Sequence, residues 1–164
     1  MDKLPSVSLL DPYVGSEILP LYTATVSVTG GSSGHGRASG QATADDGELD
    51  VVLKLPRELG GNGGGTNPEQ LFAAGYAACF HGAMKLIAMK KGMVLPKDFV
   101  VQCSATFARD PADGLFCITS KLQVVLPGVP ESDARALIQE TEATCPYSKM
   151  TKQGMASSVQ RFNA

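Results

Sequence analysis

The stretch NPEQLFAAGYAACFHGAMK, from Asn67 to Lys85, decides the fold of this chain. Thr66 or Asn67 can cap a helix, the proline that follows suits its first position, and Gly92 ends it after about Lys91. At ~1.5 Å per residue such a helix is roughly 35 Å long. Because its middle is small or apolar on every face, we expect it to be buried on all sides, wrapped by sheet and completed by a second subunit.

The segments around this helix predict strands and one further helix. A helix is expected from Pro130, capped by Ser132 or Asp133, and Cys145 ends it because the residue before a proline avoids the α region. A loop rich in glycine and serine is expected over 30–40, and a turn at Asp46–Gly47. The expected strands are 21–29, 41–46, 47–55, 98–110, 114–128 and a short one at 157–162. The order of elements predicts an α+β fold with antiparallel sheet.

Length and charge exclude several classes of protein. A chain of 164 residues suits one domain, and we place it at residues 21–164 after an extended arm of residues 1–20. The net charge of −2, without a basic run, gives no support to nucleic-acid binding. The apolar stretch at 71–80 is shorter than the ~20 residues of a bilayer-spanning helix, and the first residues do not resemble a secretory signal. We therefore expect no membrane and no nucleic-acid partner.

The four cysteines contain no CxxC and no closely spaced Cys/His cluster. A zinc site and a secreted disulfide scaffold are both disfavoured, and we expect no bound metal or cofactor. The expected compartment is reducing and intracellular, the cytoplasm or, in a eukaryote, the mitochondrion.

The glycine run GGNGGGTNPEQ before the helix invites a phosphate-binding interpretation. It lacks the Lys-Ser/Thr pair of a P-loop, Pro68 removes a backbone donor, and Glu69 places negative charge where an anion would bind. We expect instead a loop that lets the chain approach something closely or move as a lid.

Two cysteines stand apart from the others. Cys79 lies in the middle of the apolar helix, where a thiol is usually a small buried hydrophobe. Cys145 precedes a proline that can start a new helix, so its sulfur would lie near free backbone N–H groups that lower a thiol pKa. Residue patterns alone leave open whether the two are core or a working pair. Structural or solvated roles are expected for Cys103, Cys117, His35 and His81.

Thiol chemistry also needs a cation, because the thiolate is the nucleophile. Arginine suits a peroxidase, since its planar fork of donors can stabilise both the thiolate and the leaving alkoxide, and a carboxylate can hold it in place. Arg37 in the glycine- and serine-rich loop and Glu69 at the helix start are the candidates. Spacing alone does not place either beside Cys79.

Two segments, LGGNGGGTNPEQLFAAGYAACFHGAMK and CPYSKMT, closely resemble the signature segments of the organic hydroperoxide resistance proteins within the OsmC superfamily. The resemblance covers about 21–159. It implies an intertwined homodimer in which antiparallel sheets wrap long central helices, with sites at the subunit interface. It also implies a cysteine-based peroxidase that reduces organic hydroperoxides, including those of fatty acids, to alcohols.

The same resemblance implies the roles of four residues. Cys79 would be the peroxidatic cysteine that becomes a sulfenic acid, and Cys145 the resolving cysteine that forms a disulfide with it. Glu69 would orient an arginine over the thiolate. Arg37 is our candidate, although the family's arginine usually follows the first GG directly, and here SSGHG intervenes. The reductant would be dihydrolipoamide or a lipoylated protein.

Other features depart from the family or follow from it less directly. Lys149 and Lys152 change the charge beside the second cysteine, and residues 1–20 have no counterpart in the usual short members. An apolar substrate pocket is expected, with walls from Leu71, Phe72, Phe80, Met84, Tyr147 and Met150. Two alternatives stay open: a peroxidase of the OsmC branch, and a redox-sensing or acyl-ligand-binding protein without turnover.

Overall fold

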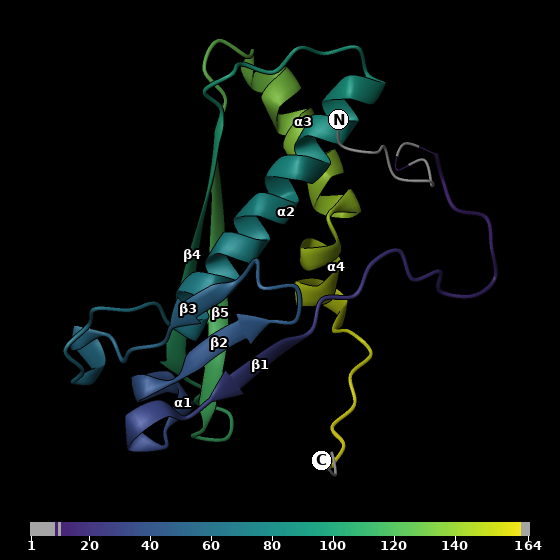
Figure 1. Ribbon diagram of the computed structural model, residues 1–164. Helices are drawn as coiled ribbons and strands as arrows, with labels where there is room; N and C mark the ends of the chain where they lie inside the picture. The colour runs from purple at the N-terminus through teal and green to yellow at the C-terminus, as the bar shows by residue number, and fades with distance from the viewer. Residues whose placement is uncertain (1–8, 10, 162–164) are drawn as a thin grey trace. The chain divides into compact units, whose positions relative to one another are not determined.

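The computed structural model describes residue 9 and residues 11–161 (Figure 1). Contacts along the chain gather into two compact units. The first unit comprises Met1–Ala74 and Ala105–Ser120, and the second comprises Gly75–Ser104 and Lys121–Ala164. The prediction of one domain over 21–164 remains a prediction.

A three-stranded antiparallel sheet forms the first unit's centre. It consists of β1 (Val26–Thr29), β2 (Gln41–Ala44) and β3 (Asp50–Val52), in that spatial order. The predicted turn between β2 and β3 is confirmed: Gly47 has a φ of +76° and its N–H donates to the carbonyl of Ala44 over 3.1 Å. The strand predicted over 21–29 was too long, because only its last four residues pair with β2.

The segment between β1 and β2 is more regular than the loop that its composition predicts. It contains a 3-10 turn, η1 (Gly31–Ser33), and a one-turn helix, α1 (Gly36–Ser39). Ser39 ties them together, since its hydroxyl accepts from the Ser33 N–H at 2.8 Å and donates to the Gly30 carbonyl at 2.7 Å. Arg37 therefore lies on an ordered segment rather than in a featureless loop.

The glycine run is closed at its base by backbone pairing. Leu53 and Thr66 form an isolated bridge, in which the Thr66 N–H donates to Val52 and the Lys54 N–H donates to Thr66. The short 3-10 turn η2 (Arg57–Leu59) lies inside the closed loop. This bridge fixes where the following helix begins.

The long helix α2 (Pro68–Lys90) confirms the predicted caps. The Asn67 side chain accepts the Gln70 N–H at 2.9 Å. At the other end Gly92 has a φ of +64° and the Met93 N–H returns to the Ala88 carbonyl. The boundary between the two units falls inside this helix.

The helix α2 is only partly buried in the single chain, so burial on all sides by a second subunit stays a prediction. Its buried residues are Tyr76, Phe80, Ala83, Met84, Ile87 and Ala88, whereas Ala74 and Ala78 are exposed.

By length and composition α2 also qualifies as a candidate membrane span, contrary to the expectation from its shorter apolar stretch. The apolar window in this helix has a mean hydropathy of 1.3, and 33% of it is buried. Core helices of soluble proteins pass the same test, so this observation is weak evidence for a membrane.

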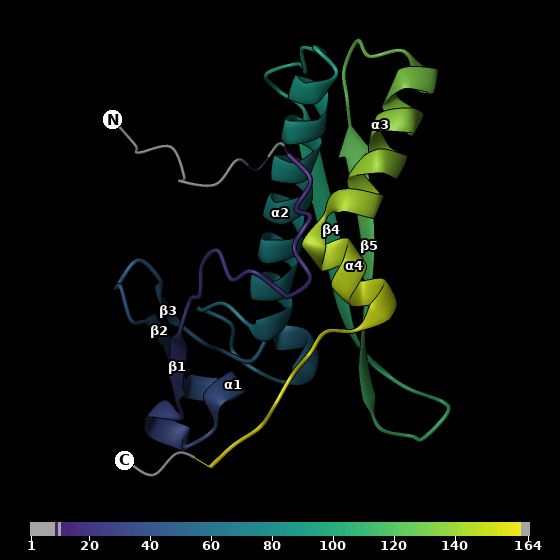
Figure 2. The same cartoon turned by 90° about the vertical axis from the view of Figure 1, so that its right-hand side faces the viewer.

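In the second unit, α3 (Glu131–Thr144) and α4 (Pro146–Gln153) run alongside α2 (Figure 2). The largest fully buried side chains here are those of Met84, Leu137, Thr141, Cys145 and Ser148. The predicted cap of α3 at Ser132 or Asp133 was wrong, because Pro130 is the N-cap residue and the helix begins at Glu131. The predicted end at Cys145 is confirmed.

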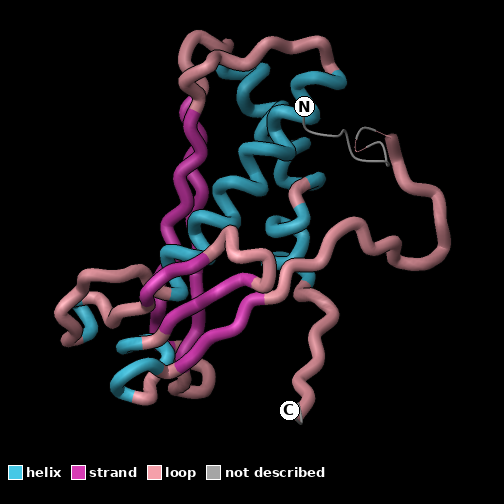
Figure 3. Tube along the Cα trace, viewed as in Figure 1, coloured by secondary structure: helices cyan, strands magenta, loops and turns pink. Residues whose placement is uncertain are grey.

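The predicted hairpin is confirmed as β4 (Val100–Arg109) and β5 (Phe116–Val125), which form a two-stranded sheet. Its turn lies in the first unit, where the Asp110 N–H donates to the Leu115 carbonyl at 2.9 Å. The strand predicted over 157–162 was wrong for its described part, since residues 157–161 are coil (Figure 3); residue 162 lies outside the described residues.

Candidate functional site

Two thiols meet in the second unit. The Sγ atoms of Cys79, on α2, and Cys145, between α3 and α4, lie 3.7 Å apart. Cys145 is fully buried, whereas Cys79 is partly accessible. A disulfide needs the sulfurs to approach to about 2.05 Å, so both cysteines are free here but close enough for modest side-chain motion to join them.

The backbone explains why Cys145 lies where it does. Its extended conformation, with φ −64° and ψ 123°, ends α3 and begins α4. Pro146 forces this conformation on the residue before it and suits the first position of α4. The predicted helix start at Pro146 is confirmed, and Cys145 lies at the junction between the two helices.

Three influences act on the pKa of Cys79. Burial raises the pKa most strongly, a backbone hydrogen bond from Tyr147 lowers it, and the neighbouring thiol of Cys145 raises it. The balance leaves the pKa of Cys79 above that of an ordinary thiol. Because the Tyr147 N–H belongs to the first turn of α4, that helix presents its positive end to the sulfur. A thiolate at this position needs further positive charge.

A polar network holds α4 against α2. The Tyr76 hydroxyl lies 3.1 Å from the buried Ser148 hydroxyl and 3.5 Å from that of Thr151. The rings of Tyr76 and Tyr147 stack with centroids 5.7 Å apart. A Cβ on Gly75 would lie 2.8 Å from the Tyr147 Oη, so the missing side chain makes room for this ring.

The predicted arginine and carboxylate pair in the first unit. One terminal nitrogen of Arg37 donates to both carboxylate oxygens of Glu69, at 2.8 and 3.0 Å. The Glu69 side chain is only 12% exposed and that of Arg37 31%. The guanidinium also lies over the Phe107 ring, 4.8 Å from its centroid. Sequence reasoning missed Phe107, because strand alternation marks it only as an ordinary half-buried residue.

The predicted wall residues divide between the units. Leu71 and Phe72 are half-buried in the first unit, and in the second Phe80 and Met84 are core residues. Tyr147 and Met150 are half-buried on α4. A common substrate pocket for these residues remains a prediction.

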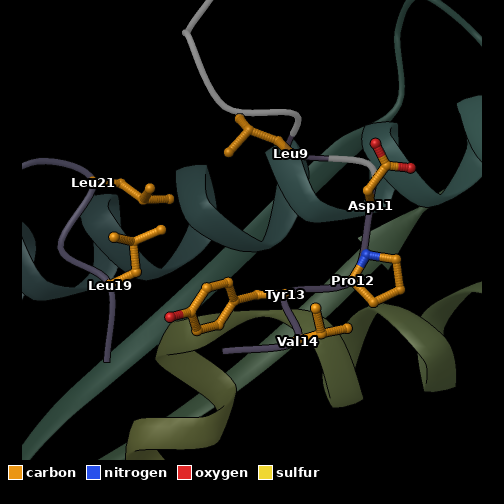
Figure 4. Close-up of a pocket in the computed structure, with 7 residues that line it drawn as sticks. All are labelled: Leu9, Asp11, Pro12, Tyr13, Val14, Leu19 and Leu21. Carbon is orange, nitrogen blue, oxygen red and sulfur yellow. The ribbon is translucent and has the colours of Figure 1, made fainter. Parts of the chain in front are cut away.

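A separate apolar concavity of about 430 Å³ lies in the arm (Figure 4). It contains no thiol and no cation, and its single charged residue is Asp11. The residues that line it are Leu9, Asp11, Pro12, Tyr13, Val14, Leu19 and Leu21. None of them is a predicted site residue.

The remaining cysteines and histidines have no comparable surroundings. Cys103 and Cys117 are half-buried on the two hairpin strands, and burial raises the pKa of Cys103. His81 stacks on Phe99 with ring centroids 3.8 Å apart, and His35 is the N-cap residue of α1. Among the described residues, no three His, Cys, Asp or Glu side chains gather as a metal site.

The two lysines that depart from the family pattern differ in their contacts. Lys152 pairs with Glu142 of α3 at 2.9 Å, which partly neutralises its charge. Lys149 is exposed. The added positive charge near the thiols is therefore smaller than the sequence implies.

Two neighbouring free thiols held on helices are the arrangement that cysteine-based redox chemistry requires, and the comparisons with known proteins identify the family. The family model described as OsmC-like protein matches residues 61–160. The organic hydroperoxide resistance protein of Xanthomonas axonopodis pv. citri (strain 306) is 44% identical over 133 residues, which cover 80% of this chain and 88% of that protein.

Solved structures agree with these sequence matches. The structure of OhrB from Bacillus subtilis has a TM-score of 0.70 at 38% identity and covers 82% of this chain and 93% of its own. An organic hydroperoxide resistance protein from Legionella pneumophila has a TM-score of 0.72 at 36% identity, with 83% and 93% covered. The chain belongs to the organic hydroperoxide resistance proteins of the OsmC-like family.

Proposed function

We propose that the chain is a thiol peroxidase that reduces organic hydroperoxides, including those of fatty acids, to alcohols. Membership of the family supports a role in organic hydroperoxide resistance and a peroxidase-type activity. The observation that carries the proposed mechanism is the 3.7 Å separation between Cys79 Sγ and Cys145 Sγ.

In the first step, the Cys79 thiolate attacks the terminal peroxide oxygen. The S–O bond forms as the O–O bond breaks, and the leaving alkoxide takes a proton to become the alcohol. Cys79 is then a sulfenic acid. The sulfur has lost two electrons and the peroxide has gained them.

In the second step, the Cys145 sulfur attacks the sulfenic sulfur. Water leaves with the thiol proton, and a Cys79–Cys145 disulfide remains. A dihydrolipoyl dithiol then reduces this disulfide by two thiol–disulfide exchanges and is itself oxidised to the cyclic disulfide. We propose a lipoylated protein as its carrier and no bound cofactor.

Arg37 is proposed to supply the positive charge that the thiolate needs. The surroundings of Cys79 leave its thiol pKa raised, so the protonated form dominates at neutral pH without a further cation. Both carboxylate oxygens of Glu69 accept from one guanidinium nitrogen, and this charge-assisted contact restrains the direction of the fork. The same charge would stabilise the leaving alkoxide.

The substrate and assembly follow from the same chemistry. An apolar site formed by the predicted wall residues favours greasy hydroperoxides over hydrogen peroxide, because it desolvates them at little cost. The half-exposed, apolar α2 supports a homodimer that covers it. We place the protein in a reducing compartment, the cytoplasm or the mitochondrion.

A peroxidase assay with dihydrolipoamide tests the proposal. Wild type should turn over tert-butyl and fatty-acid hydroperoxides faster than hydrogen peroxide, and Cys79→Ser should not. Cys103→Ser is the matched control, since its thiol is also half-buried and its pKa also raised by burial. A preference for hydrogen peroxide would favour the OsmC branch, and an oxidisable Cys79 without turnover would favour a sensor or acyl-ligand-binding protein.

A further inference from the structure

The guanidinium of Arg37 is held on two different sides. Glu69 accepts hydrogen bonds from one terminal nitrogen, and the Arg37 Cζ lies over the ring of Phe107 of β4, 4.8 Å from its centroid. These contacts do not compete, because the N–H donors of arginine lie in its plane and the attraction to a ring acts through its face. Together they restrain the guanidinium through two kinds of contact, one with a carboxylate and one with a ring.

Phe107 is itself part of a longer stack. Its ring lies 4.7 Å from that of Phe116 at an interplanar angle of 20°, and the Arg109 guanidinium covers Phe116 at 4.1 Å. Arg109 is anchored in turn by a hydrogen bond to the Gly114 carbonyl at 3.1 Å. The four side chains form an aromatic column in the order Arg37, Phe107, Phe116 and Arg109, all within the first unit.

Within this column, Phe116 restrains the Phe107 ring that Arg37 contacts. A phenylalanine on a two-stranded hairpin would otherwise share its faces with water, but here Phe116 stacks on the Phe107 ring and Arg109 covers Phe116. The Arg37 side chain is 31% exposed, so water competes for its donors whenever it leaves Glu69. The ring face restrains this motion without adding a negative charge, whereas a second carboxylate would weaken the cation's effect on a thiolate.

We propose that Phe107 is a positioning residue that acts through Arg37. Its ring restrains the guanidinium that Glu69 binds, so that the remaining donors of Arg37 keep one direction for the reaction. The inference rests on the proposed function, in which Arg37 stabilises the Cys79 thiolate. Phe107 touches neither reacting sulfur in this account and is not a catalytic residue.

The test compares Phe107→Leu, Phe107→Tyr, Arg37→Ala and the double variant with wild type in the full-length chain. Phe99→Leu is the matched control, because Phe99 also stacks on a ring, that of His81, but lies outside the column. Two readouts are needed: the rate of Cys79 oxidation by tert-butyl hydroperoxide, and the pH profile of Cys79 alkylation by iodoacetamide, followed by mass spectrometry.

Phe107→Leu should slow oxidation about three- to tenfold, as expected for loss of one cation–π contact, and move the alkylation profile to higher pH. Phe107→Tyr keeps the aromatic ring, so its oxidation rate and alkylation profile should match those of wild type. In the Arg37→Ala background, Phe107→Leu should change neither further. Phe99→Leu should leave the alkylation profile unchanged.

Additive effects in the double variant, or an unshifted alkylation profile in Phe107→Leu, would overturn the inference. The two proposals fail in different ways. If Arg37→Ala keeps the wild-type rate, the role of the arginine fails and the inference fails with it. If Arg37→Ala is slow while Phe107→Leu matches wild type, only the inference about Phe107 fails.

Discussion

The thiol pair and the arginine–glutamate pair are built by different means. Cys145 is fully buried in the second unit and is fixed by the junction of two helices. Arg37 is partly solvated in the first unit and is fixed by side-chain contacts with Glu69 and Phe107. Packing therefore places the sulfurs, while comparatively exposed contacts hold the charge. Substitutions near the sulfurs should affect stability and resolution, and those near the arginine should affect reactivity.

Loss of a sulfur should have the largest effect. Cys79→Ser should reduce peroxidase turnover to background, because no other thiol lies beside Cys145 among the described residues. Cys145→Ser should still be oxidised once by an organic hydroperoxide, at a rate measured by stopped-flow, and should then accumulate sulfenic acid detectable by dimedone. Equal loss of the first oxidation in both variants would contradict the assignment of the two roles.

Loss of the charge should come next. Arg37→Ala should lower the rate of oxidation about a hundredfold, the usual effect of removing one electrostatic stabiliser. Burial raises the pKa of Cys79, so without the arginine the thiolate fraction, and with it the rate, should keep rising with pH through the alkaline range. Wild type should reach its plateau at lower pH. Coincident pH profiles would separate Arg37 from the thiol.

A packing change near the sulfurs should act mainly on stability. Tyr76→Phe removes the hydroxyl that lies 3.1 Å from the buried Ser148 hydroxyl, and it should lower the free energy of unfolding by about 1–3 kcal/mol. Urea unfolding measures this effect. Tyr22→Phe is the control, since Tyr22 is 76% exposed and should change stability little. A tenfold loss of Cys79 oxidation in Tyr76→Phe would contradict the division between packing and charge.

The smallest effect should come from one added methyl group. Gly75→Ala places a Cβ 2.8 Å from the Tyr147 Oη, so the ring must shift. Disulfide formation should then slow about twofold to fivefold, which corresponds to a barrier increase of under about 1 kcal/mol. Gly82→Ala on the same helix meets nothing within 4 Å and should gain about 0.5–1 kcal/mol of stability. Equal behaviour of the two variants in a quenched-flow assay of disulfide formation would remove Gly75 from the account.

Local signals predicted the helices that carry the sulfurs. The helix ends depend on contacts with residues less than about one turn away, so their positions can be derived from neighbouring residues. This holds for Asn67, Gly92 and the Cys145–Pro146 pair. The cap of α3 was predicted at the wrong residue, because Pro130 caps the helix without any side-chain hydrogen bond. The strand over 21–29 was predicted too long, since its length depends on how far β2 extends beside it.

Features of the candidate site that depend on distant residues were less accessible. The pairing of Arg37 with Glu69 joins positions 32 residues apart. Their chemistry made both residues candidates, but spacing along the chain could not place them together. The stacking of Phe107 on Phe116 depends on the register of a hairpin, which no motif specifies. The backbone hydrogen bond from Tyr147 to Cys79 has no side-chain signature at all.

That backbone hydrogen bond has a consequence for how the protein can vary. The segment CPYS supplies two things to Cys79: a thiol from Cys145 and an N–H from Tyr147. A point mutation can remove the thiol, but only proline can remove the N–H. A substitution of Cys145, the proposed resolving cysteine, would therefore leave the donor to the first sulfur in place, so the two steps of the proposed reaction can vary separately.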